Sequence, residues 1–78
     1  MLIKIVLPQL GEGISKATVA LWHVQVGQLI EASEDVVEVV TDKATFNVPS
    51  PQSGRIKEIL VKEGEDVPIG GALALLDS

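Results

Sequence analysis

The chain contains no cysteine and no tyrosine, and it has only one tryptophan and one phenylalanine among its 78 residues. Without cysteine, neither a disulfide nor a thiolate-bound metal can hold a domain of this size together. So few aromatic side chains leave no stacking surface for nucleic-acid bases. Six basic residues stand against eleven acidic ones, for a net charge of −5. This balance argues against nucleic acids and anionic membrane surfaces as partners.

Long apolar runs are also missing, because the N-terminal run is interrupted by Lys4 and stopped by Pro8. That run is too short for a signal sequence or a membrane span, so we expect an intracellular module. No nucleophile–base pair, metal-ligand set or phosphate-binding loop indicates an independent enzyme. The acidic residues between Glu31 and Glu38 lack the glycine turn of a calcium loop, and we expect no metal site.

Segments rich in β-branched residues alternate with glycine and proline, which predicts a single all-β domain over residues 1–78. In Ala17–His23, alternation places Val19 and Leu21 on one face. In Arg55–Val61 the alternation is less regular and suggests burial on both faces. The predicted strands are Ile3–Leu7, Ala17–His23, Val36–Val40, Phe46–Val48, Arg55–Val61 and Ala72–Leu76, with short pairing segments at Leu29–Ile30 and Asp66–Val67.

The chain also repeats itself. Gly27 and Gly64 lie 37 positions apart in similar surroundings, whereas the match of Val6–Pro8 to Asn47–Pro49 has an offset of 41. The first half therefore carries four extra residues, which we place around Leu10–Ile14. Two such halves predict two small sheets related by a pseudo-twofold axis, because neither half can bury its apolar face alone.

Lys43 lies in a short polar interruption, Thr41–Thr45, between two of the predicted strands. Asp42 and Lys43 suit the centre of a tight turn, where the aspartate side chain can bond to nearby backbone. The small side chain of Ala44 does not hinder access to the lysine. A lysine at the tip of a hairpin, far from both termini, suggests an attachment site for a covalently bound carrier group.

Several motifs in register with this turn resemble those of lipoyl domains. They are Pro8–Ile14, Trp22, Gly27, Thr41–Ala44, Val48–Pro51 and Gly54, and the resemblance extends from about residue 3 to residue 76. More specifically, the motifs resemble those of lipoyl domains of the dihydrolipoyl acyltransferase (E2) component of 2-oxo acid dehydrogenase complexes, within the biotinyl/lipoyl attachment family.

The resemblance implies a flattened β-barrel or sandwich of two four-stranded antiparallel sheets, with lipoic acid joined by an amide to Lys43. It further implies a non-catalytic swinging-arm carrier, excised from a longer E2 chain and monomeric in isolation. Its partners would be a lipoate ligase or lipoyl transferase, a thiamine-dependent decarboxylase (E1), the acyltransferase core and a dihydrolipoamide dehydrogenase (E3). The loop of Leu10, Gly11, Glu12, Gly13 and Ile14 would fold beside the lysine hairpin and recognise the decarboxylase.

The same resemblance leaves alternatives. A biotinyl carrier domain shares the fold, but such domains usually place methionines where Asp42 and Ala44 stand here. An unmodified interaction module and the longer, helix-containing carrier of glycine cleavage are the other candidates. Asp-Lys-Ala with Val-Pro-Ser-Pro favours a pyruvate complex, with a branched-chain complex as the next choice. We expect a cytoplasmic location in a bacterium and the mitochondrial matrix in a eukaryote.

Overall fold

The computed structural model describes all 78 residues, which form eight strands. It contains no helix that is long and apolar enough to cross a membrane. The strands are β1 (Leu2–Val6), β2 (Lys16–Trp22), β3 (Leu29–Ile30), β4 (Asp35–Val40), β5 (Thr45–Pro49), β6 (Gly54–Ile59), β7 (Asp66–Pro68) and β8 (Ala72–Asp77).

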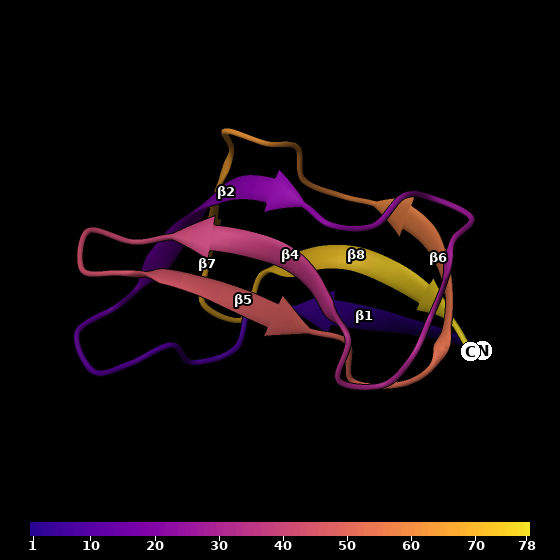
Figure 1. Ribbon diagram of the computed structural model, residues 1–78. Coiled ribbons are helices and arrows are strands. Elements are labelled where there is room, and N and C mark those ends of the chain that lie inside the picture. The colour runs from indigo at the N-terminus through magenta and orange to yellow at the C-terminus, as the bar shows by residue number, and fades with distance from the viewer.

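These strands form two four-stranded sheets, one in the order β1-β8-β6-β3 and the other in the order β5-β4-β2-β7 (Figure 1). Every neighbouring pair is antiparallel. The predicted fold class, an all-β sandwich of two four-stranded antiparallel sheets, is therefore confirmed.

The core between the sheets consists almost entirely of aliphatic side chains. The valines and isoleucines among them favour strands because branching at Cβ suits a pleated, half-buried surface. Trp22 and Phe46 pack at its margin and are only partly buried. The fifteen buried core residues are Ile5, Leu7, Ala17, Val19, Val24, Ile30, Val36, Val37, Val39, Val48, Ile56, Val67, Leu73, Ala74 and Leu76.

Two strands depart from the predicted alternation because each contains a bulge. In β2 the pairing register shifts between Val19 and Leu21, and in β6 it shifts between Ile56 and Glu58. An extra residue in one strand reverses which face the following side chains occupy. Val19 is buried but Leu21 is 46% exposed, so the prediction that they share a face is wrong.

The irregular pattern predicted for Arg55–Val61 has the same cause, a bulge and not burial on both faces. The strand also ends earlier than predicted, at Ile59. Val61 has left the sheet, and its carbonyl oxygen accepts a hydrogen bond from Trp22 Nε1 at 3.0 Å.

The internal repeat is visible in the hydrogen bonds. The Gly27 N–H donates to the Ile56 carbonyl at 2.7 Å, and the Gly64 N–H donates to the Val19 carbonyl at 2.7 Å. Each bond therefore ties a turn of one half to the bulged strand of the other half. Gly27 and Gly64 have φ angles of +91° and +92°, a conformation that glycine adopts without steric cost. The 37-residue offset is thus a property of the fold.

The second predicted offset, 41 residues, is wrong. Ser50 exchanges backbone bonds with Ser33 and Glu34, and Leu7 makes the corresponding bonds with Gly70 and Gly71. Leu7 and Ser50 are therefore equivalent, which makes the offset 43 for β1 and β5. Since 43 exceeds 37 by six, the first half has six extra residues, not four, in the loop between β1 and β2. The dipeptide Val-Pro in the second half had suggested the wrong alignment.

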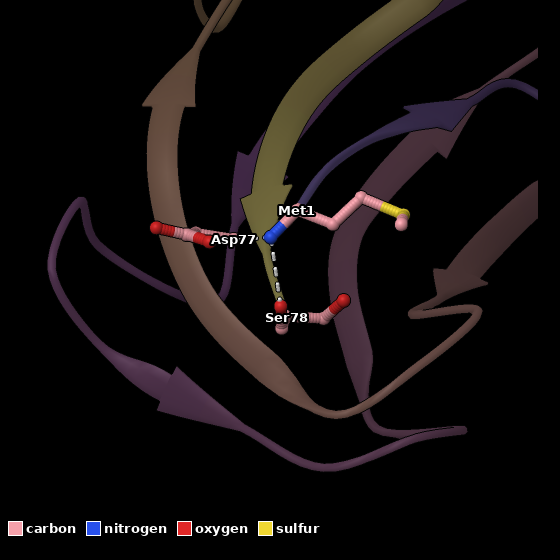
Figure 2. Close-up of polar contacts among 3 residues, drawn as sticks. All are labelled: Met1, Asp77 and Ser78. Carbon is pink, nitrogen blue, oxygen red and sulfur yellow. Dashed lines mark hydrogen bonds and ion pairs between the residues drawn. The ribbon is translucent and has the colours of Figure 1, made fainter.

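The two ends of the sandwich differ in what closes them. The turn between β4 and β5 lies at one end together with the loop between β1 and β2, and both termini lie at the other (Figure 1). There the Met1 amino group donates to the Ser78 carbonyl at 3.1 Å (Figure 2). The Ser78 N–H donates to the Met1 carbonyl at 3.0 Å. The Met1 amino group also lies 3.3 Å from Asp77 Oδ1.

Gly54 provides a test of the packing between β6 and β8. A Cβ at this position would lie 2.7 Å from the Asp77 carbonyl oxygen and 3.1 Å from Leu76 Cγ. Backbone cannot give way easily, so we predict that Gly54→Ala lowers the free energy of unfolding by about 1–3 kcal/mol. Urea denaturation will measure this loss. Lys57→Ala, at an exposed position where the other half has Ala20, is the control and should change stability by less than about 0.5 kcal/mol.

Asp66 generates a prediction about pH. The Thr18 hydroxyl donates to Asp66 Oδ1 at 2.6 Å, and Lys16 Nζ lies 3.5 Å from Oδ2. The hydrogen bond from Thr18, and then the charge of Lys16, hold the Asp66 pKa below its ordinary value. A lowered pKa in the folded state adds stability above the unfolded-state pKa, and this stability is lost as the pH falls through the folded-state pKa.

We therefore predict that Asp66→Asn is less stable than the unsubstituted protein near neutral pH. The difference should shrink as the pH falls from about 5 into the acid range, because protonated Asp66 no longer makes these interactions. Urea unfolding at a series of pH values will measure it. A difference that stays constant down to the acid limit would contradict the prediction.

Candidate functional site

The turn between β4 and β5 projects from the last strand pair, Val40 with Thr45. The Thr41 N–H donates to the Ala44 carbonyl at 2.8 Å, which places Asp42 and Lys43 at the centre of the turn. Asp42, Lys43 and Ala44 are all exposed. The sequence-based prediction of a hairpin with Lys43 near its apex is therefore confirmed.

Thr41, which the sequence analysis did not single out, is the residue that bonds the turn together. Its Oγ1 accepts hydrogen bonds from the Lys43 N–H at 3.1 Å and from the Ala44 N–H at 3.0 Å. The same hydroxyl lies 3.0 Å from the Ala44 carbonyl, to which it can donate. The sequence analysis predicts such bonds to the turn backbone for the Asp42 side chain, and that prediction is wrong because Asp42 makes no side-chain hydrogen bond. The available signal was a hydroxyl residue at the first position of a turn, where such side chains bond to local backbone.

The Lys43 amine has no ion pair and no hydrogen bond with another residue. The chain's ion pairs involve Met1 with Asp77 and Lys16 with Asp66. The structure therefore leaves the amine available to an external reagent or enzyme. The small side chain of Ala44 adds no steric barrier beside it.

The loop between β1 and β2 lies beside this amine. A Cβ on Gly13 would be 3.1 Å from Lys43 Nζ, so a side chain at Gly13 would crowd the amine in this position. Gly13 has a φ of +82°, which glycine adopts readily, and the Ile14 N–H donates to the Gly11 carbonyl at 3.3 Å. Leu10 packs against the core, and Glu12 is exposed. Of the predicted loop, residues 10–14, the structure thus places Gly13 and Ile14 beside the lysine hairpin.

A groove of about 280 Å³ separates the loop from the turn. Its apolar walls are Ile14 and Val40, and the remaining lining is polar or glycine. The lining residues are Gly13, Ile14, Ser15, Lys16, Val40, Thr41 and Asp42. A larger groove of about 910 Å³ includes Asp77 and Ser78 and therefore belongs to the end that carries the termini.

Residues outside this end form no second constellation with chemical function. His23 Nε2 lies 3.0 Å from Asn47 Oδ1 on the exposed surface, which satisfies the imidazole with an amide. No group of three or more His, Asp or Glu side chains converges to a geometry that would hold a metal ion. The site therefore consists of the lysine turn and the loop beside it.

Comparisons with known proteins agree with this geometry. The family model Biotin_lipoyl, described as "Biotin-requiring enzyme", matches residues 3–76. A lipoamide acyltransferase component of a branched-chain alpha-keto acid dehydrogenase complex from Pseudomonas aeruginosa is 41% identical over 71 residues, which are 91% of this chain and 17% of the relative. An acetyltransferase component of a pyruvate dehydrogenase complex from Corynebacterium glutamicum is 37% identical over 76 residues, 97% of this chain and 11% of the relative.

A solved structure is also similar. It is the lipoyl domain of the 2-oxoglutarate dehydrogenase complex from Azotobacter vinelandii, with a TM-score of 0.76 and 36% identity. The match covers 97% of this chain and 96% of that one. In contrast, the chain spans a fifth or less of the length of the curated relatives. This chain thus belongs to the Biotin_lipoyl family and, within it, to the lipoyl domains.

Proposed function

We propose that this domain is a carrier that holds lipoic acid as an amide on Lys43 Nζ. The observation that supports this most directly is an unpaired lysine amine at the exposed apex of a hairpin, in a domain whose solved structural neighbour is a lipoyl domain. A free amine is the chemical requirement for amide formation. No other lysine of the chain lies in a turn that joins two paired strands, because the turn at Lys62 connects β6 and β7, which belong to different sheets.

The surroundings of Lys43 fit the lipoyl group. Ala44 is small, Gly13 has no side chain, and the groove beside them is open to solvent, so an acyl chain on the amine meets no steric obstacle. When bound, lipoic acid supplies a dithiolane that accepts an acyl group and electrons. The chain's own residues contribute presentation: the turn holds the lysine backbone while its side chain remains free.

This domain would then serve the acyltransferase component of a 2-oxo acid dehydrogenase complex. Its partners would be the lipoate ligase that modifies it, the decarboxylase, the acyltransferase core and the dihydrolipoamide dehydrogenase. The domain itself would be a non-catalytic carrier and would share the compartment of that complex. Tethering would keep the arm at a millimolar effective concentration near each active site, as flexible linkers of moderate length do.

For the substrate of the complex we propose pyruvate, with a branched-chain 2-oxo acid as the alternative. The support is the combination of Asp-Lys-Ala with Val-Pro-Ser-Pro, at residues 42–44 and 48–51. The relatives belong to pyruvate, branched-chain and 2-oxoglutarate complexes at similar identity, so the proposal depends on these motifs alone.

Residues 10–14 are proposed to recognise the decarboxylase. They lie at the same end as Lys43, and Glu12 extends from the loop into solvent without a partner of its own. A decarboxylase that accepts the arm must approach this end of the domain. Contacts with the loop would then select which domain it acylates.

The modification of Lys43 can be tested by mass. On co-expression with a lipoate ligase, the intact mass of the domain should rise by one lipoyl group. Lys43→Arg should abolish the gain, because arginine keeps the charge but offers no amine for the amide bond. Lys16→Arg, at the other lysine beside the groove, is the control and should retain the gain. A biotinyl gain, or a lipoyl gain that persists in Lys43→Arg, would refute the proposal.

Recognition by residues 10–14 gives a separate prediction. In the lipoylated domain, combining Glu12→Ala with Ile14→Ala should lower kcat/KM for acylation by the decarboxylase about tenfold, which corresponds to about 1.4 kcal/mol. Ligation of lipoic acid should proceed as before, because the lysine turn is untouched. Glu31→Ala, which removes an acid from the opposite end, is the control. Unchanged acylation by the double variant would remove the loop from the recognition surface.

A further inference from the structure

The lysine turn reverses the chain without the backbone conformation that tight hairpins favour. The most common two-residue hairpin loops are type I′ and II′ turns, which need positive φ at one or both central residues. Ser33 is the only residue other than glycine with a positive φ, so Asp42 and Lys43 both have negative φ angles. Lys43 therefore avoids the positive-φ conformation, which is sterically unfavourable for residues with a Cβ. The twist of such a turn, however, fits the flanking strands less well.

The hydrogen bonds show how the turn accommodates this mismatch. The Thr41 N–H bonds to the Ala44 carbonyl, but the Ala44 N–H does not return a bond to the Thr41 carbonyl and instead bonds to Thr41 Oγ1. The Lys43 N–H bonds to the same oxygen at 3.1 Å. One side-chain oxygen therefore serves two amides of the turn that have no backbone acceptor.

The other end of the molecule provides an internal comparison. With the offsets of 37 and 43, Thr41 corresponds to Ser78 and Ala44 corresponds to Met1. At that end both backbone bonds form. The Ser78 N–H donates to the Met1 carbonyl, and the Met1 amino group donates to the Ser78 carbonyl (Figure 2). The side chain of Ser78 does not enter this pairing. The hydroxyl contact is therefore a feature of the lysine turn and not of the ladder on which it stands.

We propose that Thr41 is a positioning residue for the modification of Lys43. Its hydroxyl fixes the backbone of the apex, and with it the direction in which the Cα–Cβ bond of Lys43 leaves the turn, while the rest of the side chain stays free. A modifying enzyme would recognise the lysine in that orientation. Without the hydroxyl the Lys43 and Ala44 amides lose their acceptor, and the apex samples other conformations. The inference rests on the proposed lipoylation of Lys43 and adds the residue that makes the lysine a substrate.

The test compares lipoylation of the purified domain by a lipoate ligase across matched variants. Thr41→Val replaces the hydroxyl with a methyl group of similar size, and we expect kcat/KM to fall about tenfold or more, as small misplacements of a reacting group do. Thr41→Ser retains the hydroxyl and should remain within about twofold of the unsubstituted domain. Thr45→Val makes the same chemical change at an exposed threonine without a side-chain hydrogen bond, and it should leave the rate unchanged.

Two further measurements separate positioning from general damage. Acetylation of Lys43 by a small acylating reagent requires no enzyme and should proceed equally fast in Thr41→Val and in the unsubstituted domain. Amide hydrogen exchange at Lys43 and Ala44 should be slowed in the unsubstituted domain and accelerated in Thr41→Val. The exchange experiment on the unsubstituted domain tests the contact even if the valine variant does not fold.

The outcomes distinguish the two proposals. If the unsubstituted domain accepts no lipoyl group, the proposed function fails. If it is lipoylated but Thr41→Val is modified at the same rate, the inference about Thr41 fails and the function stands. Equal impairment of Thr41→Ser and Thr41→Val would also overturn the inference, because the serine variant keeps the hydroxyl. Unprotected Lys43 and Ala44 amides in the unsubstituted domain would do the same.

Discussion

The fold depends on an exchange of backbone hydrogen bonds between its two halves. The turn at Gly27 bonds to the bulged strand of the second half at Ile56, and the turn at Gly64 bonds to the bulged strand of the first half at Val19. Each bond contributes a net stabilisation of only about 0.5–1.5 kcal/mol, but the two carbonyls belong to the buried residues Ile56 and Val19, and a buried carbonyl left without its partner costs more. Neither half can satisfy these groups alone. The sandwich is therefore one cooperative unit, and it supplies a rigid base for the turn that carries Lys43.

Function is concentrated where the two halves differ. The strand ladder is the same at both ends of the sandwich, but one end is completed by Met1 and Ser78 and the other by the continuous turn at Lys43. The six extra residues of the first half lie in the loop beside that turn and bring Gly13 next to the lysine amine. A symmetric framework thus acquires a distinct end by two local changes, a closed turn and a longer loop.

The sequence predicted the elements of the fold better than it predicted their alignment. Branched aliphatic residues and turn-forming glycines located all eight strands, and the spacing of Gly27 and Gly64 revealed the repeat. The bulges were not predicted, because an inserted residue changes the facing of Leu21 without any change in local composition. For the site as well, the sequence predicted the location of the turn but not the hydrogen bonds within it. Thr41 and Asp42 are both turn formers, and which of them bonds to the backbone depends on φ angles that residue type does not determine.

The hydrogen bonds of the turn hold the backbone of Lys43 but leave its side chain mobile. Thr41 bonds only to the backbone of its neighbours, so the hydrogen bonds of the turn do not involve the Lys43 side chain. An ion pair on the amine would have to break before the lysine could be modified. Ordering a long side chain such as lysine costs up to about 2 kcal/mol of rotamer entropy, and a free lysine avoids that cost until an enzyme binds it. The structure therefore orders the chain up to the Cα of Lys43 and leaves the remainder to its partners.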